Sequence, residues 1–211
     1  MDRLINLLEL SSGLELTAVA FAIAYIVLAI RQSLWCWPAA VCSASLFSWL
    51  FFQGNLYMEA WLQAYYVAIA FYGFWVWRFG NKHQPIPITT RPLGFHVVWV
   101  FLLLVTSIFI SIYLRLRTDA VFPELDTVTT LFSLFTTYLV ARKVLENWLY
   151  WIVINSLYVW LFTLQGFQAT AILFAIYVIM STVGYIRWRQ DYRQNQRKRV
   201  DSAGMRVSPA R

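Results

Sequence analysis

Long blocks of apolar residues, separated by short polar segments, run along most of this chain. They cover seven stretches: 14–30, 36–53, 56–78, 95–114, 127–141, 147–164 and 168–187. About 20 helical residues cross the ~30 Å hydrocarbon layer of a bilayer, and a helix satisfies its own backbone hydrogen bonds in lipid. The pattern therefore predicts an all-α polytopic membrane protein with seven transmembrane helices.

The fifth block is the most polar of the seven, because hydroxyl residues interrupt it. These are Thr127, Thr129, Thr130, Ser133, Thr136 and Thr137. Such a helix is tolerated in lipid when its hydroxyl groups face other helices, so we expect these side chains to be buried. The composition supports a membrane location: 60% of the 211 residues are hydrophobic and 13% are charged, too few charges to cover a soluble domain.

Basic residues are distributed unevenly between the two sides of the predicted spans. With a cytoplasmic C-terminus, fourteen of the 17 Lys and Arg residues lie inside, and only Arg3, Arg115 and Arg117 lie outside. This bias predicts a bacterial inner-membrane protein with a periplasmic N-terminus. The net charge of +7 then requires no nucleic-acid partner, and we expect the basic cytoplasmic tail, 190–211, to lie against the anionic inner leaflet of the bilayer.

The sequence matches itself when it is shifted by 111 residues. Between 31–78 and 142–189, sixteen positions are identical, among them Trp37/Trp148, Gly73/Gly184 and Trp77/Trp188. Each repeat holds three spans, at 14–78 and 125–189, and the single span 95–114 links them after a cytoplasmic loop at 79–94. The interpretation is a parallel 3+1+3 repeat of the SWEET type, with a cavity between the two bundles.

Positions at which the repeats differ are candidates for ligand binding, since a ligand without twofold symmetry needs an asymmetric site. Asn155 stands opposite Ala44, and Gln63 stands opposite Phe174. An amide in lipid is costly unless it is paired, so both amides should face the bundle interior. Helical spacing places each amide on a face with aromatic residues: Trp148, Trp151 and Tyr158 accompany Asn155, and Tyr66 accompanies Gln63.

Aromatic faces and amide edges together suit a heteroaromatic ligand, which needs stacking surfaces and hydrogen bonds. The predicted substrate-binding residues are therefore Gln63, Tyr66, Trp148, Trp151, Asn155 and Tyr158. The alternative is that the amides only tie neighbouring helices together.

Several kinds of chemistry have no residues to support them. Glu15, Glu59, Asp126 and Glu146 lie at or near span ends, whereas an ion-coupled carrier usually needs a carboxylate deep in a span. No phosphate-binding loop, metal-ligand cluster or nucleophile–base set is present, so we expect no cofactor, no metal and no enzymatic activity. Cys36 and Cys42 are expected to act as small apolar residues.

The stretch Glu146–Asn155, ENWLYWIVIN, resembles the ENW-x-x-W-x-x-x-N signature of the PnuC family of nicotinamide riboside transporters. Leu164-Gln165-Gly166 also fits, as does the run from Phe51 through Gln63 to Tyr72-Gly73. The resemblance covers about residues 14–190. It implies a SWEET-like fold and facilitated diffusion of a vitamin or nucleoside, with phosphorylation by a cytoplasmic kinase trapping it. It places Trp148, Trp151, Asn155 and Gln63 in the site.

Two other hypotheses stay open from the sequence. The first is that the chain carries thiamine. It has Ala70 and Val183 where nicotinamide riboside carriers of this family often have Asn, and its layout is similar to that of the thiamine-carrying PnuT relatives. The second is a non-transporting membrane scaffold that uses the amides as structural ties. The substrate and the oligomeric state, including a homo-oligomer, are not fixed by the sequence.

Overall fold

A computed structural model describes residues 2–54, 57–80, 86–117, 123–164, 166 and 168–205. Side chains are described within these ranges except at 2–12, 57–58, 169 and 199–205. The predicted loop residues Lys82 and His83, the signature residue Gln165 and the tail residues 206–211 lie outside the described part of the chain.

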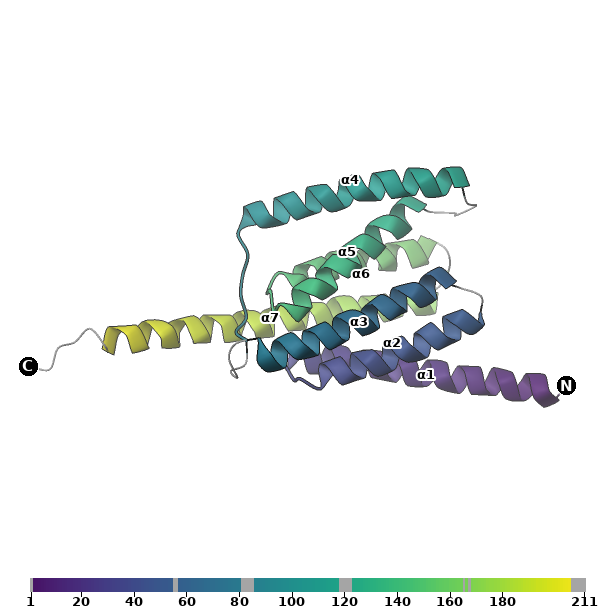
Figure 1. Cartoon of the computed structure of the whole chain (residues 1–211), viewed down its shortest axis with the longest axis horizontal. Coiled ribbons are helices and arrows are strands. Elements are labelled where there is room, and N and C mark those ends of the chain that lie inside the picture. The colour runs from purple at the N-terminus through teal and green to yellow at the C-terminus, as the bar shows by residue number, and fades with distance from the viewer. Residues whose placement is uncertain are drawn as a thin grey trace, which may run out of the picture. The chain divides into compact units, whose positions relative to one another are not determined.

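The described residues form seven helices, as predicted (Figure 1). They are α1 (Asp2–Ile30), α2 (Cys36–Gln53), α3 (Tyr57–Phe79), α4 (Leu93–Arg117), α5 (Pro123–Ala141), α6 (Asn147–Leu164) and α7 (Gln168–Met205). Two helices run well past the predicted spans: α1 begins before residue 14 and α7 continues beyond residue 187. Much of the basic tail is therefore the end of one continuous helix.

Four helices contain segments that are long and apolar enough to span a membrane by composition alone: Gly13–Ile30, Leu93–Arg117, Asn147–Leu164 and Thr170–Lys198. Among the described residues, α2, α3 and α5 do not meet this criterion of length and composition. Five of the six hydroxyl residues predicted to be buried on α5 are buried, and Thr130 is half-buried. Thr129 and Thr136 are almost inaccessible and donate to the carbonyls of Leu125 and Phe132. Internal hydrogen bonds of this kind satisfy polar groups in lipid.

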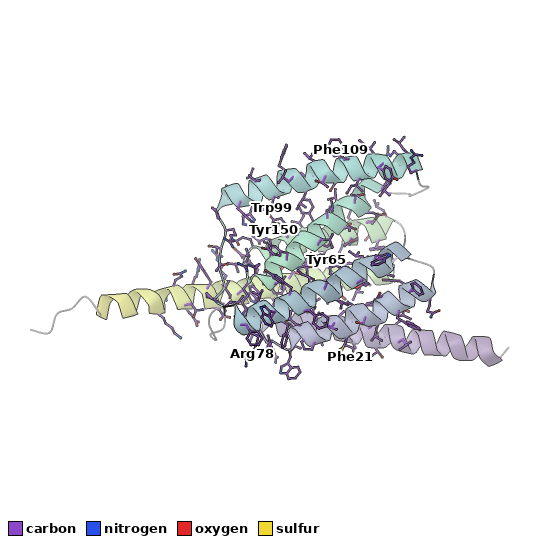
Figure 2. All side chains as sticks on the ribbon, in the orientation of Figure 1. Phe21, Tyr65, Arg78, Trp99, Phe109 and Tyr150 are labelled. Atoms are coloured by element: carbon purple, nitrogen blue, oxygen red, sulfur yellow. The ribbon has the colours of Figure 1, made fainter. Side chains whose placement is uncertain are left out.

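The chain divides into two compact units, 1–86 with 140–142 and 87–139 with 143–211. In the first unit α1 packs on α2 and α2 packs on α3; in the second, α6 packs on α7. Helix α4 belongs to the second unit, where Trp99 stacks on Phe135 of α5 at a centroid distance of 5.1 Å. Figure 2 labels Trp99 on α4 and Tyr150 on α6, and both rings contact Phe135.

The internal repeat is reproduced in the backbone of the turns before α2 and α6. Gln32 and Lys143, which are equivalent positions, both have a positive φ, 55° and 49°. In the first turn the Ser33 amide donates to the Leu28 carbonyl. In the second turn the equivalent Val144 amide donates to the equivalent Leu139 carbonyl. A left-handed residue followed by such a bond ends a helix sharply. Both repeats therefore end one helix and start the next in the same way.

The repeat is also reproduced in how the helices pack. Trp37 meets Trp77 edge-on at 5.3 Å, and the equivalent Trp148 meets Trp188 at 5.5 Å. A Cβ atom on Gly73 would lie 2.3 Å from the Trp37 ring, and one on Gly184 would lie 2.7 Å from the Trp148 ring. In each unit a glycine thus gives a buried indole room to lie directly against the neighbouring helix.

Each repeat has the same exposed stripe. On α2 it contains Ser45, Trp49 and Phe52, and on α6 it contains the equivalent Ser156, Trp160 and Thr163. Trp49 and Trp160 are 57% and 59% exposed. We expect this stripe of exposed large apolar side chains to be the lipid-facing side of each helix.

Candidate substrate-binding residues

The structure places Trp148, Trp151, Asn155 and Tyr158 along α6, in the second unit, and Gln63 and Tyr66 on α3, in the first unit. On α6 the four residues lie on the face away from the exposed stripe, and on α3 Gln63 and Tyr66 are both half-buried. Within each unit, the six residues differ sharply in what they already contact.

Trp148 is part of the packing of the fold. It is 3% exposed, its ring lies against Gly184 and it meets Trp188 edge-on. Its indole Nε1 is buried and has no hydrogen-bond partner among the described residues, and the same holds for the equivalent Trp37. Because both repeats keep this arrangement, the packing explains the tryptophan without a ligand; a direct contact between Trp148 and substrate stays a prediction.

The two residues before Trp148 also hold the structure together, a role that the sequence analysis did not assign to them. The Glu146 carboxylate accepts a hydrogen bond from the Arg91 amide at 3.4 Å and lies 3.9 Å from His96 Nε2. The fully buried Asn147 donates to the Val144 carbonyl at 2.6 Å. Their position at the start of α6, rather than in its middle, was the sequence signal that could have predicted a structural role.

A short backbone segment reinforces this turn. Thr89 pairs with Val144 in an isolated parallel bridge: its amide donates to the Lys143 carbonyl at 2.9 Å, and its carbonyl accepts from the Leu145 amide at 2.8 Å. His96, which the sequence left without a role, contacts the Tyr150 hydroxyl at 3.0 Å. The segment leading into α4 is therefore attached to the α5–α6 turn by both main-chain and side-chain bonds.

Asn155 is buried and its amide nitrogen lies 3.5 Å from the Ser181 hydroxyl on α7. The equivalent residues in the first unit are Ala44 and Ala70, both buried. The second unit thus has a polar pair where the first has two small apolar residues. This contact is the interhelical tie that the alternative reading expects, and at 3.5 Å it is a long hydrogen bond.

Tyr158 has ring partners on two helices. It stacks on Phe174 at 4.6 Å and on Phe162 at 6.0 Å. Trp151 differs, because it is half-buried and none of the described residues forms a ring contact with it. Of the aromatic residues predicted on α6, Trp151 therefore has the face most available to a ligand.

In the first unit, Gln63 is half-buried, and its amide has no hydrogen-bond partner among the residues that the structure describes. Tyr66, three residues on, contacts Tyr65 edge-on at 5.9 Å and lies near Tyr25. An unpaired amide on the protein-facing side of a membrane helix costs free energy unless something pairs with it. In this unit Gln63 is therefore a second polar group without a described partner, in addition to the buried Trp37 Nε1.

Within the described residues, no group of three or more His, Cys, Asp or Glu side chains is placed to hold a metal ion. What the faces of α3 and α6 offer is aromatic surface and amide groups, in a seven-helix membrane protein built from two three-helix repeats. That combination defines a membrane transporter for small organic molecules.

The comparisons with known proteins agree with this class. The chain shares its fold with a solved structure described as the crystal structure of the vitamin B3 transporter PnuC, with a TM-score of 0.70 and 22% identity over 91% of this chain and 87% of that one. The family model for the nicotinamide mononucleotide transporters matches residues 12–190. The protein belongs to this family of membrane transporters and is not an enzyme.

Curated relatives carry the name nicotinamide riboside transporter PnuC. The protein from Escherichia coli strain K12 is 28% identical over 178 residues, which cover 72% of this chain and 74% of the relative. The protein from Neisseria mucosa is 26% identical over 159 residues, which cover 69% of this chain and 60% of the relative.

Proposed function

We propose that this protein carries nicotinamide riboside into the bacterial cell across the inner membrane by facilitated diffusion, and that phosphorylation by a cytoplasmic kinase traps the substrate inside. The observation that carries the proposal is the family match over residues 12–190, together with curated relatives that are named for this substrate. The positive-inside distribution of Lys and Arg supports a periplasmic N-terminus and a cytoplasmic C-terminus.

The distribution of charge favours a nucleoside over a nucleotide, although the family is named for the mononucleotide. Within the seven predicted spans the only Lys or Arg residues are Arg78 and Arg187, each at the last position of its span. A phosphate group taken from water into a low-dielectric site needs a cation or several donors to replace its hydration. Nicotinamide riboside has no phosphate, and its pyridinium ring suits an aromatic face such as that of Trp151.

Binding to the purified protein in lipid nanodiscs tests the substrate. Isothermal titration with nicotinamide riboside should give saturable binding, while nicotinamide mononucleotide and thiamine should bind at least tenfold more weakly. Tighter binding of thiamine would assign the chain to the thiamine-carrying branch of the family. Failure to bind any of the three by a folded protein would favour the scaffold hypothesis.

Asn155 is expected to take part in binding in addition to its contact with Ser181. Replacing it with leucine would leave a polar group of the ligand unpaired, at a cost of about 1–3 kcal/mol, or a roughly 5- to 150-fold rise in Kd. Ser181→Ala is the matched control, because it removes the helix partner and leaves the amide in place. If Asn155→Leu lowers the melting temperature as Ser181→Ala does and leaves Kd unchanged, Asn155 is only an interhelical tie.

A further inference from the structure

The end of α3, in the first unit, carries a group of exposed aromatic side chains. Tyr72, Trp75 and Phe79 follow one another at steps of three and four residues, which places them on one face of the helix. All three are exposed, Trp75 most of all at 64%. Trp75 and Phe79 contact each other at a centroid distance of 4.8 Å. Aromatic side chains exposed at the end of a span are typical of the boundary between acyl chains and lipid headgroups.

Two arginine guanidinium groups lie at this aromatic face. Arg78, which Figure 2 labels on α3, has its Cζ atom 5.4 Å from the centroid of the Phe79 ring. Arg142, directly after α5, donates from Nη1 to the Tyr72 hydroxyl at 3.4 Å. Both arginines are exposed, and neither has a carboxylate partner among the described residues. The face therefore combines aromatic surface with two positive charges that no described anion neutralises.

A buried contact fixes the position of Arg142. The indole Nε1 of Trp77 donates to the carbonyl of Ala141 at 3.1 Å, and both residues are buried. Ala141 and Arg142 belong to the same compact unit as α3. The guanidinium is thus held at Tyr72 by the backbone of the residue before it. A donor that is already in place loses less conformational entropy when a ligand binds.

The second unit does not repeat this chemistry. The equivalent face of α7 is also exposed, but its residues at the three positions are Val183, Ile186 and Gln190. Arg78 has an equivalent in Arg189, whereas a valine in place of Tyr72 cannot bind an arginine. Exposure of this face is therefore common to both repeats, and the aromatic residues and the tyrosine-bound arginine distinguish the first.

An anionic phospholipid fits this face better than a second copy of the chain does. Guanidinium groups form strong, often bidentate hydrogen bonds with phosphate, and aromatic rings suit the adjoining acyl chains. The distribution of Lys and Arg predicts that this end of the unit is cytoplasmic, where the leaflet is anionic. A second copy would bring mostly like charge, because fourteen of the 17 basic residues lie on that side.

We propose that Tyr72, Trp75, Arg78 and Arg142 form a binding site for an anionic phospholipid at the cytoplasmic end of the first unit. Both guanidinium groups contact the lipid phosphate, and Tyr72 holds Arg142 in position. Trp75 and the neighbouring Phe79 lie against the upper part of the acyl chains. The site is made of other residues than those predicted to bind substrate, and it does not depend on the proposed function.

Thermal unfolding of the delipidated protein in micelles of a neutral detergent tests the ligand. A ligand that binds only the folded state raises the melting temperature as its concentration rises. Phosphatidylglycerol should raise the melting temperature of the wild type to a plateau. Phosphatidylcholine with the same acyl chains, or inorganic phosphate alone, should leave it nearly unchanged. An equal rise with either of these two would overturn a site for anionic lipid.

Arginine variants test the site itself. Arg142→Gln and Arg78→Gln should each raise the phosphatidylglycerol concentration at half-maximal effect by about fivefold or more, since a basic residue near an anionic surface contributes about 1 kcal/mol. Arg189→Gln is the matched control, because it removes the same charge at the position of α7 equivalent to Arg78, and it should stay within twofold of the wild type. Equal effects of Arg78→Gln and Arg189→Gln would show attraction by total charge and overturn the site.

Two further variants separate the parts of the site. Tyr72→Phe keeps the ring and removes the hydroxyl, so it should weaken the lipid effect, and adding it to Arg142→Gln should weaken the effect no further. Additive effects would contradict the role of Tyr72 in holding Arg142. Trp75→Ile introduces the residue of the second unit at an exposed position. It should weaken the lipid effect while the melting temperature without lipid stays unchanged, and a wild-type lipid effect would contradict a contact between Trp75 and the lipid.

The protein mass in the micelle distinguishes a lipid from a second copy of the chain. Light scattering should give the same protein mass for the wild type, Arg142→Gln and Trp75→Ile. A lower mass in the two variants, together with no effect of phosphatidylglycerol on the wild type, would assign this face to contact between copies and overturn the lipid site.

Discussion

Gly73→Ala is expected to destabilise the first unit strongly. The added Cβ would lie 2.3 Å from the Trp37 ring, closer than two carbon atoms approach, and the indole is fully buried against α1 and α3. Overpacking a filled core costs about 1–3 kcal/mol. Gly184→Ala, with a distance of 2.7 Å to Trp148, should have a similar but smaller effect. Thermal unfolding in detergent, followed by intrinsic fluorescence, measures both.

Gly94→Ala provides the matched control for the glycine variants. A Cβ on Gly94, in the first turn of α4, meets nothing within 4 Å. Alanine is also the better helix former, so the melting temperature should be unchanged or slightly higher. If Gly73→Ala melts no earlier than Gly94→Ala, then the close contact between glycine and indole does not hold the three-helix units together.

Trp151→Ala should abolish measurable binding of nicotinamide riboside while the protein stays folded. The half-buried indole has no ring partner among the described residues, so its removal disrupts no aromatic packing in the unit. A ligand that stacks on it loses about 0.5–1.5 kcal/mol of ring interaction. It also loses apolar burial, worth about 25 cal/mol per Å². The sum raises Kd by well over tenfold.

Trp160→Ala makes the same substitution on the same helix at a position that is 59% exposed and faces lipid. Equilibrium binding of radiolabelled substrate to both variants, after size-exclusion chromatography has shown that they are folded, gives the comparison. Trp160→Ala should bind as the wild type does. Wild-type affinity in Trp151→Ala would remove this residue from the binding site.

The helices and the repeat could be predicted from the sequence because both depend on local patterns. Apolar blocks of membrane-spanning length predict the seven helices, and matched residues such as Trp37/Trp148 and Gly73/Gly184 predict equivalent packing, which both repeats show. The continuation of α7 to Met205 was not predicted, since that segment is polar and an apolar block marks only the membrane-spanning part of a helix. Helical propensity of its Arg, Gln and Lys residues is the signal that was available.

The candidate site was predicted less completely, because helical spacing tells which residues share a face but not what they touch. Trp148 and Trp151 share a face of α6, yet the first lies against Gly184 and the second meets no described ring. Asn155 and Gln63 both break the repeat, yet only Asn155 has a described partner. Such differences depend on residues far away in the sequence, and only the packed units reveal them.

Uptake into proteoliposomes that contain the purified protein tests passive transport of nicotinamide riboside most directly. An ion-coupled carrier usually needs a carboxylate deep in a span, and the predicted spans of this chain have none there, so we expect passive transport. Radiolabelled nicotinamide riboside should enter until the inside and outside concentrations are equal, and an imposed proton or sodium gradient should leave this level unchanged. Enclosing a nicotinamide riboside kinase and ATP inside the proteoliposomes should raise the trapped label well above this equilibrium level. Accumulation of unmodified nicotinamide riboside above the outside concentration, driven by either gradient, would contradict facilitated diffusion.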